Sequence, residues 1–244
     1  MKRTLLEMTQ SILSDMDSEG VNSISDTVEA LQVASVIEDT FYNIVSVRDI
    51  PEHLQLLKIT SLSDSTRPTH FEYPENARKL LTVRYNVETT ASPSYREIGF
   101  VDPLTFLSRM KMTGTNVIKV TDVAGGTSIC VRNDTPPSYY TSFDDEHIVM
   151  DSYDASVDST LLTAKTQAYG YVLPTFSQTD GFKPDLDDPM LVYLLAEAKS
   201  TCFSLFKSGV DPKVDQATRR LKSYVQNDQH RSQRENKRPT YGRR

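Results

Sequence analysis

The stretch DDPMLVYLLAEAKSTCFSLFKSGVDPKVDQATRRLKSYV, residues 187–225, predicts two consecutive helices. Asp188-Pro189 and Asp211-Pro212 each place a capping carboxylate before a proline, a residue that the first turn of a helix accepts. Gly209 ends the first helix, as glycine commonly does. Apolar residues recur at helical spacing after each pair: Leu191, Leu194, Leu195, Ala198, Cys202 and Leu205, then Val214, Ala217, Leu221, Tyr224 and Val225. We therefore expect an αα-hairpin over residues 185–229.

The N-terminal residues 1–50 show the same helical spacing. Ser23 and Asp26 resemble a capping box, and Pro51 ends the pattern. The apolar positions are Leu5, Leu6, Met8, Ile12, Leu13 and Met16 in residues 3–16, followed by Val28, Leu31, Ala34, Ile37, Phe41 and Ile44. We expect these helices to pack on the C-terminal hairpin as one helical bundle.

Residues 51–184 have the composition of β-strands. Short β-branched or aromatic segments, bounded by Pro, Gly, Asn or Asp, are LQLLKIT, KLLTVRYNVE, NVIKVTDV, TSICVRN, EHIVMDSYD and AKTQAYGYVL. Gly125-Gly126 predicts a tight primed turn within a hairpin, and Asp102-Pro103 opens one short helix. The fold class is therefore α+β, with terminal helices around an antiparallel sandwich or barrel.

Residues 230–244, HRSQRENKRPTYGRR, form a basic arm on an otherwise acidic chain that has 27 basic and 33 acidic residues. Fully extended, the arm reaches about 50 Å, far enough to lie along a neighbouring molecule. Docking on a partner protein, binding of nucleic acid and a purely solubilising role remain open. For partner binding, the candidate residues are Arg231, Arg234, Lys237, Arg238, Tyr241, Arg243 and Arg244.

No motif for catalysis or for a cofactor stands out. The four histidines, His53, His70, His147 and His230, are not spaced as zinc ligands, and there is no GxSxG, Walker A or GxGxxG motif. The acidic clusters at residues 144–147, 151–158 and 185–188 could hold a cation or an acid/base pair, but solvated turns and helix caps explain them better. We expect no enzymatic activity, no cofactor and no metal.

The aromatic residues Tyr139, Tyr140 and Phe143 could stack on bases. Because Lys and Arg are absent between Arg132 and Lys165, core or subunit contacts explain them better. We expect no signal peptide, because the N-terminus has no unbroken apolar region, and no apolar run approaches the ~18 residues that a membrane span needs. Its two cysteines form no disulfide framework, so we expect synthesis in the cytoplasm.

The order of the C-terminal segments resembles a known family. PPSYYTSFDDEHIVMDSYDASVDSTLLTAKTQAYGYVLPTF, PDLDD, LLAEAKSTCFSLFK and DPKVDQATRRLK are similar to segments of the head-to-tail adaptor (connector) proteins of tailed bacteriophages, which are related to the tail tubular A proteins of short-tailed phages. The resemblance covers residues 1–50 and 130–244 in layout and is most specific at 136–188 and 195–244. Residues 60–130 carry little of it.

The resemblance implies a structural virion protein that forms a homo-oligomeric, dodecameric ring at the head–tail junction. Its partners would be the portal protein, a nozzle or tail-tube protein, and double-stranded DNA that passes through the channel without specific binding. An acidic body suits such a channel because like charges repel the phosphates. Two alternatives remain, a nucleic-acid-binding protein that uses the basic arm and a cell-wall-degrading tail component.

Overall fold

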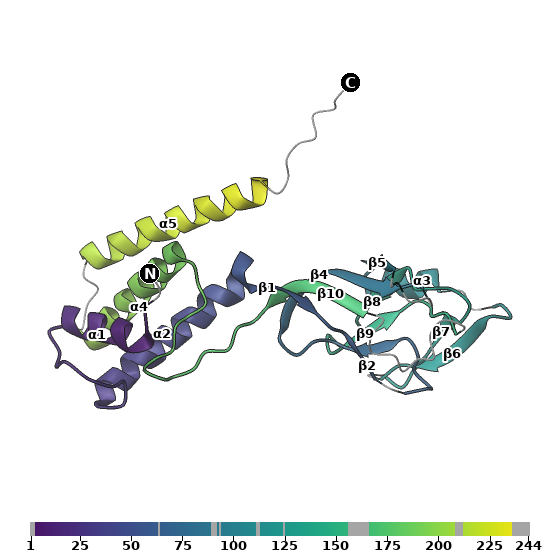
Figure 1. Ribbon diagram of the computed structural model, residues 1–244, viewed down its shortest axis with the longest axis horizontal. Coiled ribbons are helices and arrows are strands. Elements are labelled where there is room, and N and C mark those ends of the chain that lie inside the picture. The colour runs from purple at the N-terminus through teal and green to yellow at the C-terminus, as the bar shows by residue number, and fades with distance from the viewer. Residues whose placement is uncertain are drawn as a thin grey trace, which may run out of the picture. The chain divides into compact units, whose positions relative to one another are not determined.

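The computed structural model describes residues 3–62, 64–88, 92, 94–110, 113–123, 125–155, 166–207 and 212–235, with side chains as far as residue 227. The chain is a mixed α+β protein that forms two compact units (Figure 1). Met1–Glu52 and Pro174–Arg244 make up the helical unit, and His53–Leu173 make up the β unit. The sequence predicts a middle domain over residues 51–184, whereas the chain returns to the helical unit at Pro174.

The helical unit contains α1 (Leu5–Asp15), α2 (Val28–Val47), α4 (Asp188–Phe206) and α5 (Pro212–Glu235). The capping box belongs to α1, where the Thr4 hydroxyl accepts the Glu7 N–H and the Glu7 carboxylate accepts the Thr4 N–H. The box that the sequence suggested at residues 23–26 is wrong. Helix α2 is capped by Thr27, and the Asp26 carboxylate accepts two backbone N–H groups in the turn before it.

The two C-terminal helices are confirmed, with changed ends. Helix α4 begins one residue early, because the Asp187 carboxylate, not that of Asp188, accepts the Met190 N–H at 3.0 Å. Helix α5 continues through Glu235, so residues 230–235 are helical rather than extended. A helix rises 1.5 Å per residue, and the reach expected for an extended arm is therefore too long. Residues 236–244 lie outside the described chain.

The core of the helical unit combines residues from both halves of the unit. Helix α4 lies between α2 and α5 (Figure 1), and the buried set runs from Leu5 and Phe41 to Leu194 and Val225. The segment after Pro174 closes this core, since the Phe176 ring centroid lies 5.3 Å from that of Phe41. The expected apolar stripes are partly wrong, because their members Val28, Leu31, Leu205, Ala217 and Tyr224 are exposed.

The β unit is built on one curled eight-stranded sheet in the order β1-β10-β4-β5-β8-β9-β3-β2. Its strands are β1 (Leu54–Leu57), β2 (Thr60–Ser61), β3 (His70–Glu72), β4 (Ala77–Asn86), β5 (Tyr95–Phe100), β8 (Tyr139–Thr141), β9 (His147–Met150) and β10 (Thr166–Val172). All pairs are antiparallel except β5 with β8. The curled sheet confirms the expected β-rich middle, which is antiparallel in all but one strand pair of this sheet. The core joins both halves of the sheet, including Val83, Ala168 and Ile148.

The predicted hairpin and short helix are confirmed as β6 (Val117–Thr121), β7 (Ser128–Arg132) and α3 (Pro103–Arg109), with Asp102 as the N-cap of α3. The turn is longer than a two-residue primed turn, since the Asp122 N–H donates to the Thr127 carbonyl at 2.9 Å. Of the two glycines, only Gly126 has a positive φ, of 61°. Strands β3, β5 and β8 were not expected, and LQLLKIT is divided between β1 and β2.

Candidate partner-binding groove

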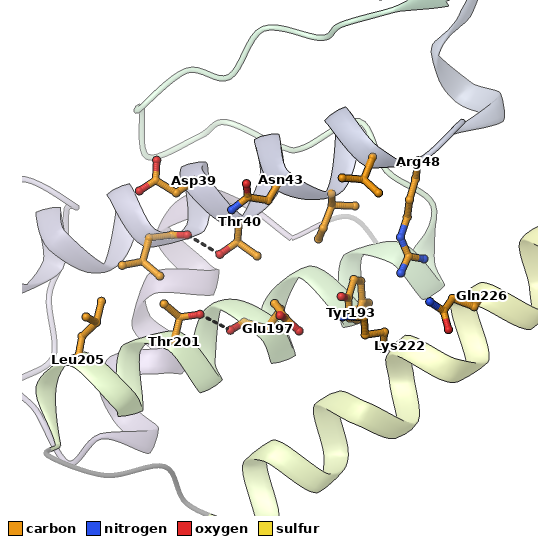
Figure 2. A pocket seen from close by; sticks show the side chains of 13 residues that line it. Asp39, Thr40, Asn43, Arg48, Tyr193, Glu197, Thr201, Leu205, Lys222 and Gln226 are labelled. Carbon is orange, nitrogen blue, oxygen red and sulfur yellow. Dashed lines mark hydrogen bonds between the residues drawn. The ribbon is translucent and has the colours of Figure 1, made fainter.

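A groove of about 730 Å³ lies on the helical unit between α2, α4 and α5 (Figure 2). Its apolar part is formed by Val36, Ile44, Val47 and Leu205. Two of these side chains are strongly exposed, Val47 at 82% and Leu205 at 63%. Exposed aliphatic side chains beside a groove between helices provide the kind of surface on which a partner segment docks.

Two threonines extend this apolar part. The Thr40 hydroxyl donates to the Val36 carbonyl at 2.7 Å, and the Thr201 hydroxyl donates to the Glu197 carbonyl at 3.0 Å. Figure 2 shows both hydrogen bonds within the walls of the groove. Because each hydroxyl is satisfied by its own helix, the threonine methyl groups add to the apolar lining.

One end of the groove is polar and basic. The Arg48 guanidinium, at the C-cap of α2, lies 5.0 Å from the centroid of the Tyr193 ring on α4. Lys222 and Gln226 reach the same end from α5 (Figure 2). The Arg48 Nη1 atom is buried and has no acceptor among the described residues. A buried donor without an acceptor is costly, so this end favours a ligand that brings a carboxylate or a carbonyl oxygen.

The Tyr193 phenol and the charged side chains around it set the electrostatics of the groove. Burial raises the pKa of the Tyr193 phenol, Glu197 adds to this effect and Arg48 opposes it. A phenol with a raised pKa stays protonated at neutral pH and is a poor general base. Asp39 lies in the same groove on the exposed face of α2, away from the Arg48 end (Figure 2). The groove can therefore orient a partner segment by charge, basic at one end and acidic farther along.

The predicted site residues are not brought together by the described chain. Arg231 and Arg234 belong to the last turns of α5, and the positions of their side chains are not described. Lys237, Arg238, Tyr241, Arg243 and Arg244 lie outside the described residues. Their docking on a partner stays a prediction. Sequence reasoning missed the groove because Arg48 and Tyr193 are far apart in the chain and neither belongs to a recognisable motif.

In the acidic turn at residues 144–147, a carboxylate accepts hydrogen bonds from nearby backbone N–H groups. Oxygen and nitrogen atoms of Asp144, Glu146 and His147 lie within 4.8 Å of one another and could surround a cation. However, the Asp144 carboxylate already accepts the backbone N–H groups of Glu146 and His147 and contacts His147 Nδ1 at 2.6 Å. Burial raises the pKa of Asp144, but the hydrogen bonds from His147 and the Glu146 N–H, together with the charge of His147, outweigh burial and lower the pKa. This cluster is therefore explained as a turn.

Asp151 corrects the expectation that residues 151–158 form a solvated turn. Its Oδ1 accepts the backbone N–H groups of Ser138 at 2.9 Å and Tyr139 at 3.0 Å, where β8 begins. Asp158 lies outside the described residues. In the third cluster, Asp187 caps α4, which confirms the expected helix cap.

The aromatic cluster is mostly packed inside the β unit. Tyr140 is buried, and the Phe143 ring centroid lies 6.0 Å from that of Phe106. Tyr139 is 40% exposed, and the Arg109 guanidinium lies 4.9 Å from its ring centroid. The fold thus supplies a cation that the local sequence lacks, although a single arginine is far from a surface that follows a phosphate backbone.

Comparison of the chain with known protein families gives no match, and no curated protein is similar to it at a significant level. None of the helices in the described part of the chain has the length and the apolar composition needed to cross a membrane. The geometry of the groove and the residues that resemble phage adaptors are therefore the grounds on which a function can be proposed.

Proposed function

We propose that this protein is a head-to-tail adaptor of a tailed bacteriophage. In this proposal it forms a homo-oligomeric, dodecameric ring in the virion, joins the portal to the tail and continues the DNA channel. The observation that carries the proposal is the shared core of the helical unit, in which Leu5 and Phe41 pack with Leu194 and Val225. A helical bundle made from both parts of the chain, around a β-rich middle, is the layout that the family resemblance implies.

Three further features support the proposal. The groove between α2, α4 and α5 offers an apolar surface with a basic end, which suits a protein partner. The chain carries a net charge of −6, which suits a channel that DNA must pass without binding. Arginines in the C-terminal residues can make paired hydrogen bonds to carboxylates of the portal. The protein acts here as a structural component, without a catalytic step or a cofactor.

Binding to isolated portal rings tests this function. The full chain mixed with portal rings is expected to form a second ring on the portal, visible by electron microscopy of negatively stained particles. Because α5 extends to Glu235, two truncations separate the helical and distal parts of the arm. Removal of residues 236–244 is expected to weaken portal binding, and removal of 231–244 to abolish it, with unchanged circular dichroism of the remaining fold.

Two results would contradict the proposal. In the first, the full chain does not bind portal rings but is retained on double-stranded DNA, and deletion of residues 231–244 removes that retention. The arm would then bind nucleic acid. If the purified chain clears a suspension of cell walls, the protein is a wall-degrading component. If both truncated chains bind portal rings as strongly as the full chain, the adaptor function stands and the arm has no role in portal binding.

A further inference from the structure

Two apolar side chains at the start of α2 are left uncovered. Val28, the first residue of the helix, is 73% exposed, and Leu31 is 41% exposed one turn later. Residues three apart lie on one face of a helix, so the two side chains form a single apolar projection, called here the α2 knob. The neighbouring side chains Asp26 and Glu29 are acidic.

A second groove on the helical unit, of about 340 Å³, lies between α1, α4 and α5 and is called here the α1–α4–α5 groove. Val192 and Leu195 of α4 face Ala217 and Leu221 of α5 across it. Val192 is 53% exposed. The Thr218 hydroxyl, which also lines the groove, lies 3.1 Å from the Ala196 carbonyl oxygen and 3.0 Å from that of Val214. It can donate its hydrogen bond to either, so it adds no unsatisfied polar group. The groove is therefore a mainly apolar surface left open to solvent.

The rim of this groove carries the opposite charge to the surroundings of the α2 knob. Lys199 and Lys213 line the rim, and Lys199 Nζ lies 2.5 Å from the Asp15 carboxylate. Asp15 also lines the groove, so these two lysines and one aspartate carry a formal net charge of +1. The carboxylates of Asp26 and Glu29 would face these ammonium groups if the knob entered the groove, and opposite charges at the edge of a contact favour its register.

The knob lies on α2, whereas the groove is lined by residues of α1, α4 and α5. Helix α4 lies between α2 and α5 (Figure 1), so the knob and the groove are different surfaces of the helical unit. A surface that contacts a different surface on an identical chain makes a heterologous contact, which closes into a ring when the rotation between copies allows it. The two surfaces are therefore placed as the two halves of a repeating contact.

We propose that the α2 knob of one copy docks in the α1–α4–α5 groove of the next copy. This inference rests on the proposed adaptor function and supplies its ring with a specific contact between subunits. Val28 and Leu31 lose their exposed apolar surface against Val192, Leu195 and Leu221 of the neighbour. Asp26 and Glu29 come to lie beside the neighbour's basic rim. The groove between α2, α4 and α5 stays free for a different partner.

Disulfide trapping tests the contact directly. The full chain with Cys130→Ser, Val28→Cys and Ala217→Cys, held in a glutathione redox buffer, is expected to form a ladder of dimers, trimers and larger species on a non-reducing gel. The matched control replaces Val28→Cys by Val47→Cys, a valine that is also exposed, at the other end of the same helix. The control is expected to stay monomeric. Absence of a ladder from the first variant, or an equal ladder from the control, would overturn the proposal.

Complementation tests the head-to-tail geometry. Val28→Asp replaces the more exposed of the two apolar side chains of the knob by a carboxylate, which is favourable in the first turn of a helix. Ala217→Asp places a charge in the groove at an exposed position. Each variant is expected to associate roughly tenfold or more weakly than the unmodified chain in sedimentation velocity, from the loss of apolar contact. An equimolar mixture is expected to give dimers and nothing larger, since only one intact pair of faces remains.

The outcomes separate this contact from the proposed function. If the mixture gives no dimer, or if Val28→Asp associates as strongly as the unmodified chain, the contact is wrong. Portal rings that still gain a complete second ring from Val28→Asp would overturn the contact and retain the adaptor function. A disulfide ladder from a chain that ignores portal rings would retain the contact and overturn the adaptor function. Unchanged urea midpoints for both variants show that the folded state is intact.

Discussion

The helical unit and the β unit are stabilised in different ways. One continuous apolar core joins α1, α2, α4 and α5. The β unit divides its apolar residues between two smaller clusters. It adds specific polar contacts, such as His70 with Asp122 at 3.2 Å and the Thr166 hydroxyl with the Ile59 carbonyl at 2.7 Å. We therefore expect substitutions to destabilise the helical unit mainly through lost packing. In the β unit, we expect the loss of single polar or backbone contacts to destabilise the fold most.

Phe41→Ala should produce the largest effect. The Phe41 side chain is fully buried, and its ring contacts those of Tyr42 and Phe176. Removing it leaves a cavity, and we expect the free energy of unfolding of the helical unit to fall by about 3–5 kcal/mol. Hydrogen exchange should accelerate in α1, α2 and α4 together, because they share one core. Acceleration confined to α2 would break the idea of a single core. Leu205→Ala, at an exposed position on α4, is the control.

Gly170→Ala tests the backbone of the β unit. The added methyl carbon would overlap the Lys79 carbonyl oxygen and lie 3.0 Å from Leu80 Cα, where the pairing of β10 with β4 shifts register. Because backbone atoms cannot move aside easily, we expect a loss of about 1–3 kcal/mol in urea unfolding. Gly99→Ala on β5 is the control, since its methyl carbon would meet only ordinary contacts at 3.6 Å or more. Equal losses from both substitutions would show that steric overlap is not the cause.

Asp151→Ala tests whether a single carboxylate stabilises β8. The substitution leaves the N–H groups of Ser138 and Tyr139 without their acceptor, and we expect a loss of about 1–3 kcal/mol. Asp151→Asn keeps an acceptor oxygen but removes the charge, so its loss should be smaller. Equilibrium unfolding in urea at pH 7 gives both values. If Asp151→Ala changes the free energy of unfolding by no more than about ±0.5 kcal/mol, Asp151 behaves as an ordinary solvated surface residue.

The pH dependence of the β unit should be the smallest of the four effects. Burial lowers the pKa of His70 below 6.5, and the hydrogen bond that the imidazole donates to the Asp122 carboxylate does not overcome this effect. The unfolded chain therefore binds this proton first as the pH falls. The contribution to stability is complete above pH 6.5 and is lost as the pH falls toward the folded pKa, by at most about 1.4 kcal/mol per pH unit.

Urea unfolding of the β unit between pH 7.5 and 5.5 measures this dependence. His70→Gln should flatten it, whereas His147→Gln, on the partly buried turn with Asp144, should reduce it less, because the charge of His147 is the smallest of the causes that lower the His70 pKa. If the slope of the unfolding free energy against pH is unchanged in His70→Gln, another group causes the titration. His70 would then not be among the polar contacts that distinguish the β unit from the helical unit.

The sequence predicted the parts of the fold that depend on local periodicity. Helices α1 to α5 and the β6–β7 hairpin follow from apolar spacing, prolines and glycines. Strands β3, β5 and β8 were missed, because HFE, YREIGF and YYT are short or rich in polar residues and are strands only through their neighbours in the sheet. The parallel pairing of β5 with β8 depends on the tertiary fold, since the whole of α3 and the β6–β7 hairpin lies between them in the chain.

The candidate groove could not be predicted for a similar reason. Arg48, Tyr193 and Lys222 come from three helices, and no spacing within the sequence relates them. The role of Asp151 was also hidden, since an acidic turn reads the same whether its carboxylates contact water or backbone N–H groups. In contrast, the cap at Asp187 was predictable to within one residue because capping depends on local sequence alone.

The helical unit is built from two separate parts of the chain, and this affects how the protein folds during translation. Helix α2 is complete at Val47, but Met190, Leu194 and Val225, which cover its core, emerge much later. At ordinary rates of about 5–20 residues per second, the delay is roughly 10–35 s. During that interval the continuous His53–Leu173 segment can fold while Ile37, Phe41 and Ile44 have no C-terminal helices to pack against. Nascent chains would therefore depend on chaperones until the last helices leave the exit tunnel, and a circular permutant that joins the two halves of the helical unit would shorten this dependence.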